Sequence, residues 1–295
     1  MAGEPHSASD EETEEAFLSI FDWLSSRNIT VKKYKQQESA DVVFDQLATF
    51  LGERFDSLRH VHDRIRRNLS TGSNFTLNLS SRSQEEIADS TQFCTLLHKY
   101  AFLSSYRYNK NSKVIYATPQ KDSKAINFFT GGWFERFVFL KVTSLLSQNK
   151  LKYVYLMNPQ ISLPNGDDFE LDLLFLVEND PLWLECKTGN YQSYIAKYSK
   201  VRSTLTIPKE SSILIILGIS DKLTSELTDL YDITVANQNN FLDKIAAALD
   251  LLELPRDTTP SIPIQPGKLS ILLNKASLRP LPEIRPEVID QLLID

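Results

Sequence analysis

The hydrophobic positions of the first seventy residues follow a helical rhythm. Before Arg27, apolar side chains recur every three or four positions, at Phe17, Ile20, Phe21 and Leu24. The apolar and β-branched piece 29–31 then predicts an extended segment. From residue 40 to 69 the three-to-four spacing returns and predicts a long helix, in which Gly52 is a candidate break. This part of the chain is therefore expected to be mainly helical.

Residues 75–119 combine both periodicities. A helix is predicted to begin near Ser83, because Glu86 three residues later completes a capping-box pattern, and a second apolar helix is predicted around 93–97. Aromatic and β-branched residues predict two strands, 102–108 and 113–118, joined by a polar turn. Helix, helix and hairpin in this order suggest a winged-helix module.

A winged-helix module commonly binds duplex nucleic acid or mediates dimers. Arg107, Lys110 and Lys113 lie on the expected wing and are the residues that would contact phosphates. The segment in the position of a recognition helix, 89–99, carries few cations. A packing or dimerisation module is therefore an equal alternative.

The pattern divides the chain into four parts. Residues 1–15 hold six acidic residues and no Lys or Arg, which predicts a disordered tail, and residues 16–120 form the helical, winged-helix-like region. Residues 125–252 alternate between helices and strands, which predicts an α/β core. Residues 253–295 are rich in proline and are expected to run extended over the surface.

The bulk composition is that of a globular protein, with 42% apolar residues. The net charge of −6 equals the charge of the acidic tail, so the remaining chain is formally neutral and a nucleic-acid partner is compatible with it. The two cysteines, Cys94 and Cys186, are too few for a disulfide framework. The sequence contains no apolar run of the ~18 residues that a membrane span needs, so we expect a cytoplasmic protein without a membrane partner.

The most informative segment, 169–189, consists of two apolar strands around a short polar turn. If Val177 lies opposite Leu182, Asp172 lies opposite Lys187. Because side chains alternate along a strand, two groups are expected on opposite faces: Glu170, Asp172, Glu185 and Lys187 on one, and Leu171, Leu173, Leu184 and Cys186 on the other. The hairpin is thus expected to have one core face and one charged face.

Three carboxylates and an ammonium on an apolar hairpin are costly to bury unless they are paired or bind a cation. Asp172 and Glu185 offer oxygen ligands suited to Mg²⁺ or Mn²⁺, and the backbone carbonyl of Cys186 could add another. Lys187 could orient or help deprotonate an attacking water and stabilise charge on phosphorus. This arrangement predicts phosphodiester hydrolysis.

An additional carboxylate, Glu135, stands near the start of a strongly apolar helix, directly after Gly131-Gly132-Trp133-Phe134. A carboxylate in the first turn stabilises a helix through its dipole, so a purely structural role is one alternative. The glycines would also allow another backbone or a ligand to approach closely. Together with the hairpin, Glu135 is expected to be a further metal ligand or base.

The order Glu135, then Asp172, then Glu185-Cys186-Lys187, on helix, strand and strand, resembles the PD-(D/E)XK nuclease superfamily, which includes restriction endonucleases. More narrowly, 131–135, 169–172 and 185–188 are similar to the nuclease domain of CRISPR-ancillary effectors activated by cyclic oligonucleotides. The resemblance covers residues 125–252, and Leu171 stands where the superfamily's name has Pro. A Rossmann-like sensor domain usually precedes this nuclease domain, and the first 120 residues lack its alternating pattern.

The resemblance implies a restriction-endonuclease-like mixed sheet flanked by helices. It implies a metal-dependent endonuclease with one or two Mg²⁺ or Mn²⁺ ions that cuts DNA or RNA, acts as a homodimer and serves host defence. Lys197 and Arg202 fall on the segment that resembles the helix after the catalytic hairpin and could meet phosphates, with solvated helix-face positions as the alternative. A non-catalytic nucleic-acid-binding regulator, or a dimerisation scaffold on the same fold, is the alternative function.

Overall fold

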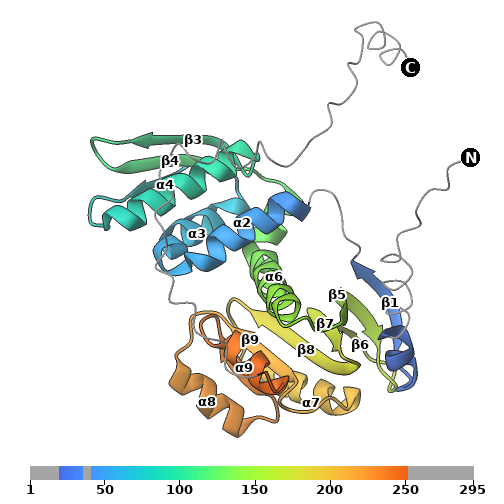
Figure 1. The fold of residues 1–295 in the computed structure, drawn as a ribbon. Helices are drawn as coiled ribbons and strands as arrows, with labels where there is room; N and C mark the ends of the chain where they lie inside the picture. The colour runs from blue at the N-terminus through green and yellow to red at the C-terminus, as the bar shows by residue number, and fades with distance from the viewer. Residues whose placement is uncertain (1–19, 36–40, 252–295) are drawn as a thin grey trace, which may run out of the picture. The chain divides into compact units, whose positions relative to one another are not determined.

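The computed structural model describes residues 20–35 and 41–251, which contain two β-sheets (Figure 1). The expected acidic tail, 1–15, and the expected proline-rich extension, 253–295, lie outside the described residues. No helix within the described ranges is long and apolar enough to cross a bilayer.

The larger sheet has seven strands in the order β1-β5-β7-β8-β9-β10, with β6 paired to β5. The strands are β1 (Thr30–Lys35), β5 (Tyr153–Ser162), β6 (Asp168–Glu170), β7 (Leu173–Val177), β8 (Asp180–Lys187), β9 (Ser212–Ile216) and β10 (Thr234–Asn237). Strands β5, β7 and β8 are antiparallel neighbours, whereas β8, β9 and β10 run parallel. The predicted α/β architecture with a mixed sheet flanked by helices is confirmed.

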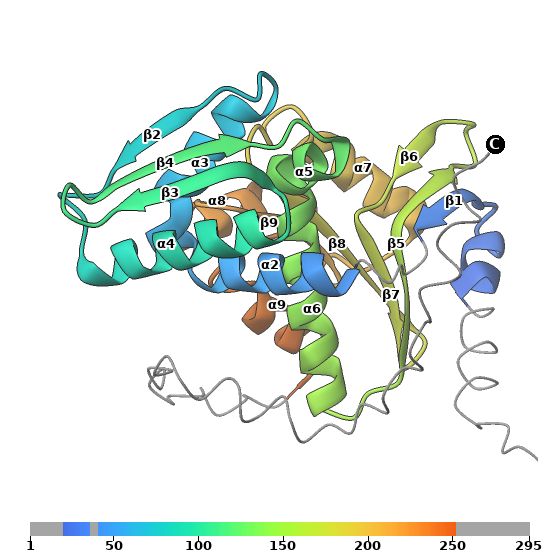
Figure 2. The ribbon, with the colours of Figure 1, turned by 90° about the horizontal axis from the view of Figure 1, so that it is seen from above.

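Both faces of this sheet are packed. The helices α6 (Trp133–Gln148) and α9 (Phe241–Ala248) contribute to one apolar cluster, and α7 (Ile195–Leu205) contributes to the other (Figure 2). Every residue of β7 and β9 is therefore buried. The expectation of one charged face is wrong, because Leu174, Leu176 and Trp183 on the Glu185 side also belong to a core.

The expected hairpin register is wrong by two residues. Val177 pairs with Asp180 rather than with Leu182, because the turn consists only of Glu178 and Asn179. Both turn residues have positive φ, 49° and 75°, as a tight type I′ hairpin turn requires. Glu185 and Lys187 share a side whatever the register, because they lie two residues apart on β8.

Irregular backbone precedes β7. Leu171 and Asp172 lie between β6 and β7, and Leu171 packs in the cluster opposite to that of Leu173 and Cys186. Contrary to the predicted alternation, Leu171 thus does not share a face with Leu173, Leu184 and Cys186. Within β5, Asn158 adopts φ 47° and its N–H donates to the carbonyl of Asp172 at 2.9 Å. Against β1 the register of β5 shifts at this point, whereas Asp172 keeps this main-chain hydrogen bond to β5.

The smaller sheet has the order β2-β4-β3 and packs with three helices. Its strands are β2 (Phe75–Asn78), β3 (Leu103–Asn109) and β4 (Val114–Pro119), and the helices are α2 (Asp41–Glu53), α3 (Phe55–Leu69) and α4 (Gln84–Lys99). The predicted capping box at Ser83 and Glu86 is present. The two helices expected after it are instead one continuous helix, α4, because no breaking residue separates its two apolar segments.

The helical region and the large sheet share packing. One apolar cluster includes residues of α2, α3, α4, α6 and β8, and β1 pairs with β5. The structure therefore places Thr30–Lys35 in the sheet that the sequence pattern assigned only to residues after 125. Between the two regions, α5 (Ser123–Asn127) and a π-helical turn, η1 (Phe128–Gly132), lead into α6, with a kink at Gly131.

Gly52 lies where α2 crosses α6. A Cβ atom built on Gly52 would stand 2.2 Å from the Phe137 ring, and Phe137 is buried. Gly52→Ala is therefore expected to destabilise the protein by ~1–3 kcal/mol through overpacking, although Ala is the better helix former by ~1 kcal/mol. Urea denaturation measures this, with Gly189→Ala as a control, since a Cβ there meets no atom within 4 Å. A Gly52→Ala protein at least as stable as the wild type would contradict the expectation.

Candidate active site

Asp172, Glu185 and Lys187 converge beside the β7–β8 hairpin. The Lys187 Nζ lies 3.3 Å from Asp172 Oδ2 and 3.5 Å from Glu185 Oε2. Asp172 and Glu185 are 7% and 1% exposed, whereas Lys187 is half-buried. The structure thus brings together three of the four predicted catalytic residues around one ammonium group.

Main-chain and indole donors fix both carboxylates. The Cys186 N–H donates to Asp172 Oδ2 at 2.7 Å, and the Asp172 N–H donates to Glu185 Oε1 at 3.0 Å. The Trp183 Nε1–H donates to the same Glu185 oxygen at 3.1 Å. These reciprocal bonds hold the two carboxylates in fixed orientations without a ligand.

The site is short of positive charge. Burial, with Asp172 repulsion second, raises the pKa of the Glu185 carboxyl well above its usual range, and burial also raises the pKa of Asp172. Although burial acts to lower it, the pKa of Lys187 is raised by Asp172 and Glu185, so Lys187 remains protonated. One ammonium therefore faces an excess of buried carboxyl groups, and a cation would relieve that excess.

Glu135 occupies the first turn of α6, next to this group. The Asn158 side-chain amide donates to Glu135 Oε2 at 3.0 Å, and a Cβ on Gly131 would lie 3.8 Å from Glu135 Oε1. Burial and the nearby Asp172 charge raise the pKa of Glu135 to about 7. Glu135 thus belongs electrostatically to the same group.

A cleft of about 520 Å³ opens on the Glu135 side. Its lining includes Glu135, Asn158, Gly131, Lys35 and Glu170, from η1, α6, β1, β5 and β6. Gly131 and Gly132 also line this cleft, and the close approach of a ligand to them stays a prediction. Of the four predicted catalytic residues, Glu135 lines this cleft, whereas Asp172, Glu185 and Lys187 do not.

The donor set fits an open magnesium-type site. Within the described ranges, no group of three or more His, Cys, Asp or Glu side chains is arranged to hold a metal ion. Mg²⁺, however, commonly takes only one or two protein carboxylates and completes its shell with water and phosphate oxygens. The Cys186 N–H faces Asp172, and the carbonyl of the same strand residue points to the same side. Asp172, Glu185 and this carbonyl suit such a site, and a ligand role for Glu135 stays a prediction.

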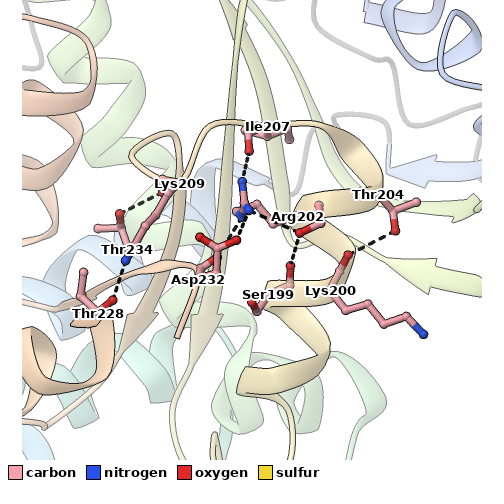
Figure 3. A network of polar contacts seen from close by, with 10 residues as sticks. Ser199, Lys200, Arg202, Thr204, Ile207, Lys209, Thr228, Asp232 and Thr234 are labelled. Atoms are coloured by element: carbon pink, nitrogen blue, oxygen red, sulfur yellow. Dashed lines mark hydrogen bonds and ion pairs between the residues drawn. The ribbon is translucent and has the colours of Figure 1, made fainter. Parts of the chain in front are cut away.

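Arg202 has a structural environment (Figure 3). Its Nε donates to the Asp232 carbonyl at 2.8 Å, its Nη1 donates to the Ile207 carbonyl at 2.7 Å, and its Nη2 forms an ion pair with the Asp232 carboxylate. These contacts tie the end of α7 to the segment before β10. A phosphate would have to displace them, so we leave Arg202 out of the proposed site.

The other cations predicted to meet phosphates are dispersed. Lys197 is exposed, with its Nζ 4.8 Å from the centre of the Phe169 ring. Arg107 lies on β3, and Lys110 and Lys113 flank the turn between β3 and β4. No contact joins these four to the carboxylate group within the described residues, so their role in nucleic-acid binding stays a prediction.

The sequence pattern missed two residues that support the site. Asn158 holds Glu135, and Trp183 holds Glu185. A signal existed for the first, because Asn158-Pro159 interrupts an otherwise regular strand and such a pair marks a bulge. Trp183 carried none, since an aromatic residue in a buried strand is ordinary core material.

No protein-family model matches the sequence, and no curated protein matches it either. Several solved structures share its fold, among them the following two. Can2 from Sulfobacillus thermosulfidooxidans, in complex with cyclic tetra-adenylate, aligns with a TM-score of 0.53 and 15% identity, over 78% of this chain and 60% of Can2. The protein VC1899 from Vibrio cholerae aligns with a TM-score of 0.51 and 18% identity, over 79% of this chain and 61% of VC1899. This chain thus spans about three fifths of the length of each, and the likeness shows the fold alone.

Proposed function

We propose that this protein is a divalent-metal-dependent nuclease that hydrolyses phosphodiester bonds at Asp172, Glu185 and Lys187, with Glu135 beside them. The observation that carries the proposal is the pair of buried carboxylates around Lys187 Nζ, within 3.3 and 3.5 Å. The motif order resembles PD-(D/E)XK nucleases, and the fold is like that of Can2, which binds cyclic tetra-adenylate. A place in CRISPR-associated defence follows as part of the same proposal.

Each side chain has a role consistent with its environment. Asp172 and Glu185, with the Cys186 carbonyl, are the groups that would hold Mg²⁺ or Mn²⁺. When bound, the ion supplies a Lewis acid for a phosphoryl oxygen and lowers the pKa of a bound water. Lys187 stays protonated, so it donates to the attacking water or to the phosphoryl oxygen and does not accept a proton.

Glu135 is the remaining proton acceptor of the group. It lines the cleft, and its pKa of about 7 lies near the operating range of a general base. The Asn158 amide, bonded to Oε2, fixes the direction in which the carboxylate faces. We therefore assign Glu135 to receive the proton of the attacking water.

Cleavage of labelled single- and double-stranded DNA and RNA tests the proposal. We expect cutting in Mg²⁺ or Mn²⁺, none in EDTA, and a loss of about a thousandfold or more in Asp172→Ala, because transition-state charge loses its support. Asp180→Ala is the matched control, since Asp180 is an exposed carboxylate at the other end of the same hairpin.

Two results would contradict the proposal. If cleavage persists in EDTA or in the Asp172→Ala variant, the reaction takes place at a different site or comes from a contaminating nuclease. Binding of nucleic acid without cutting in any metal, with and without cyclic tetra-adenylate, would favour the non-catalytic regulator.

A further inference from the structure

The three-stranded sheet has one packed face and one open face. Phe75, Leu77, Ile115 and Ala117 are buried in the cluster that contains residues of α3 and α4. The opposite face carries polar side chains and forms a groove of about 440 Å³. The groove lies on residues of β2, β3 and β4, and no metal-site residue belongs to it.

A row of three side chains crosses this open face. The strand register places Thr76 opposite Tyr116, and Tyr116 opposite Arg107. The Arg107 guanidinium lies 4.6 Å from the centre of the Tyr116 ring, which is 37% exposed. An aromatic ring and a guanidinium plane thus lie together at the surface, where each can stack on a planar group.

A second row beside it is polar and internally bonded. Thr118 Oγ1 lies 2.7 Å from Ser105 Oγ and donates to the Asn74 side-chain carbonyl at 2.7 Å. These short side chains occupy the groove beside Tyr116 without filling it. Hydroxyl and amide groups of this kind suit sugar and phosphate contacts.

The charge around the sheet is one-sided. Residues 64–84 and 90–121 contain no Asp or Glu, in a chain whose net charge is −6. Their cations include Arg107 on β3 and Lys110 and Lys113 in the β3–β4 connection, whereas Arg64, Arg66, Arg67 and Lys99 lie on the helices of the packed side. Among the described residues, only Arg82 of this set forms an ion pair with a carboxylate, that of Glu86. Unneutralised cations concentrated on one part of an acidic protein favour a polyanion.

The sheet is a better candidate surface than the helix α4. Glu85 and Glu86 lie in the first turn of α4 and would repel the phosphates of a duplex groove. We propose that the open face of β2, β4 and β3 binds single-stranded nucleic acid, with a base stacked on Tyr116 and Arg107 and phosphates held by the cations of the β3–β4 connection, Lys110 and Lys113. A single strand is required because bases within a duplex are already stacked. The inference rests on the proposed function in that the bound strand would be the substrate.

Fluorescence anisotropy in EDTA measures this binding without cleavage. The probes are a labelled single-stranded RNA of mixed sequence, the DNA of the same sequence, and the duplex of that DNA. We expect Tyr116→Ala to weaken single-strand binding about tenfold or more, and Tyr116→Phe to retain it, because the ring supplies the stacking. Arg107→Ala should weaken binding and lower the dependence of log affinity on log salt by about one. Lys222→Ala, an exposed cation on α8 (Asp221–Leu230), is the matched control.

The outcomes separate this inference from the proposed function. Equal affinity in wild type and Tyr116→Ala, or duplex bound more tightly than either single strand, would overturn the single-strand surface while leaving metal-dependent cleavage intact. If single-strand binding depends on Tyr116 but the protein cuts no substrate, the binding surface is supported and the proposed nuclease activity is contradicted. A Tyr116→Ala loss that Tyr116→Phe shares would also overturn the stacking role.

Discussion

Replacing Glu185 by Gln is expected to lower the rate of metal-dependent cleavage about a thousandfold or more. The same replacement is expected to stabilise the metal-free protein. Glu185 is 1% exposed, and burial followed by Asp172 repulsion raises its pKa. Its ionised form therefore costs folding free energy. The Gln side chain keeps an oxygen for the Asp172 N–H and the Trp183 indole, so the packing and these two bonds remain.

The pH dependence of this gain has a definite sign. A carboxyl group whose pKa is raised on folding destabilises the fold above its unfolded pKa of about 4.5, and the penalty grows with pH towards the folded pKa. Glu185→Gln removes the penalty. The increase in Tm should thus be larger at pH 8 than at pH 5.

Thermal unfolding in EDTA, repeated with Mg²⁺, measures both effects. Mg²⁺ should raise the Tm of the wild type and leave that of Glu185→Gln unchanged, because only a folded state that binds the ion gains from it. Glu226→Gln is the control, since Glu226 is an exposed carboxylate of α8. Persistent cleavage in Glu185→Gln, or lower stability than the wild type at both pH values, would refute the assignment.

The hairpin illustrates what local patterning can and cannot predict. The apolar runs and the alternation predicted two adjacent strands with Glu185 and Lys187 on one side, and the structure agrees. The two-residue turn was not predicted because it needs a positive φ at Glu178, and glutamate rarely adopts that conformation. Because the error in register was an even number of residues, it left unchanged which paired side chains share a face, and an error of one residue would have reversed this. Glu185 and Lys187 share a side in either case, since they lie two residues apart on β8.

Features that depend on distant partners were beyond the sequence pattern. β1 pairs with β5, more than a hundred residues later, and the residues of β1 give no indication of which strand it pairs with. The sequence placed the Arg202 guanidinium where it could meet a phosphate, but in the structure it pairs with the carboxylate of Asp232, thirty residues later. In contrast, the sequence alone singles out Glu135 as a candidate, because a charge in an apolar helix is visible locally; its role in the site stays a prediction. The sequence shows where each charged residue stands in the chain, whereas the partner of each charge is known only from the folded structure.

Removing the ammonium from the site should be the most destabilising of the changes considered. Lys187→Met is expected to lower the free energy of unfolding by ~3–5 kcal/mol at neutral pH, because Asp172 and Glu185 are then buried without their counter-charge. Met has a similar length and leaves little space unfilled. Cleavage should be lost as well, since no proton donor would remain beside the carboxylates.

A second substitution distinguishes charge imbalance from lost packing. Adding Glu185→Gln to Lys187→Met removes one uncompensated carboxylate and should recover ~1–2 kcal/mol of stability beyond the gain that Glu185→Gln gives alone, without restoring cleavage. Urea denaturation of the four proteins of this cycle, with Lys222→Met as an exposed control, supplies the coupling energy. Strict additivity would mean that the Lys187 ammonium does not stabilise the ionised Glu185 carboxylate. Positive coupling would mean that the ammonium offsets the cost of burying that carboxylate in its ionised form.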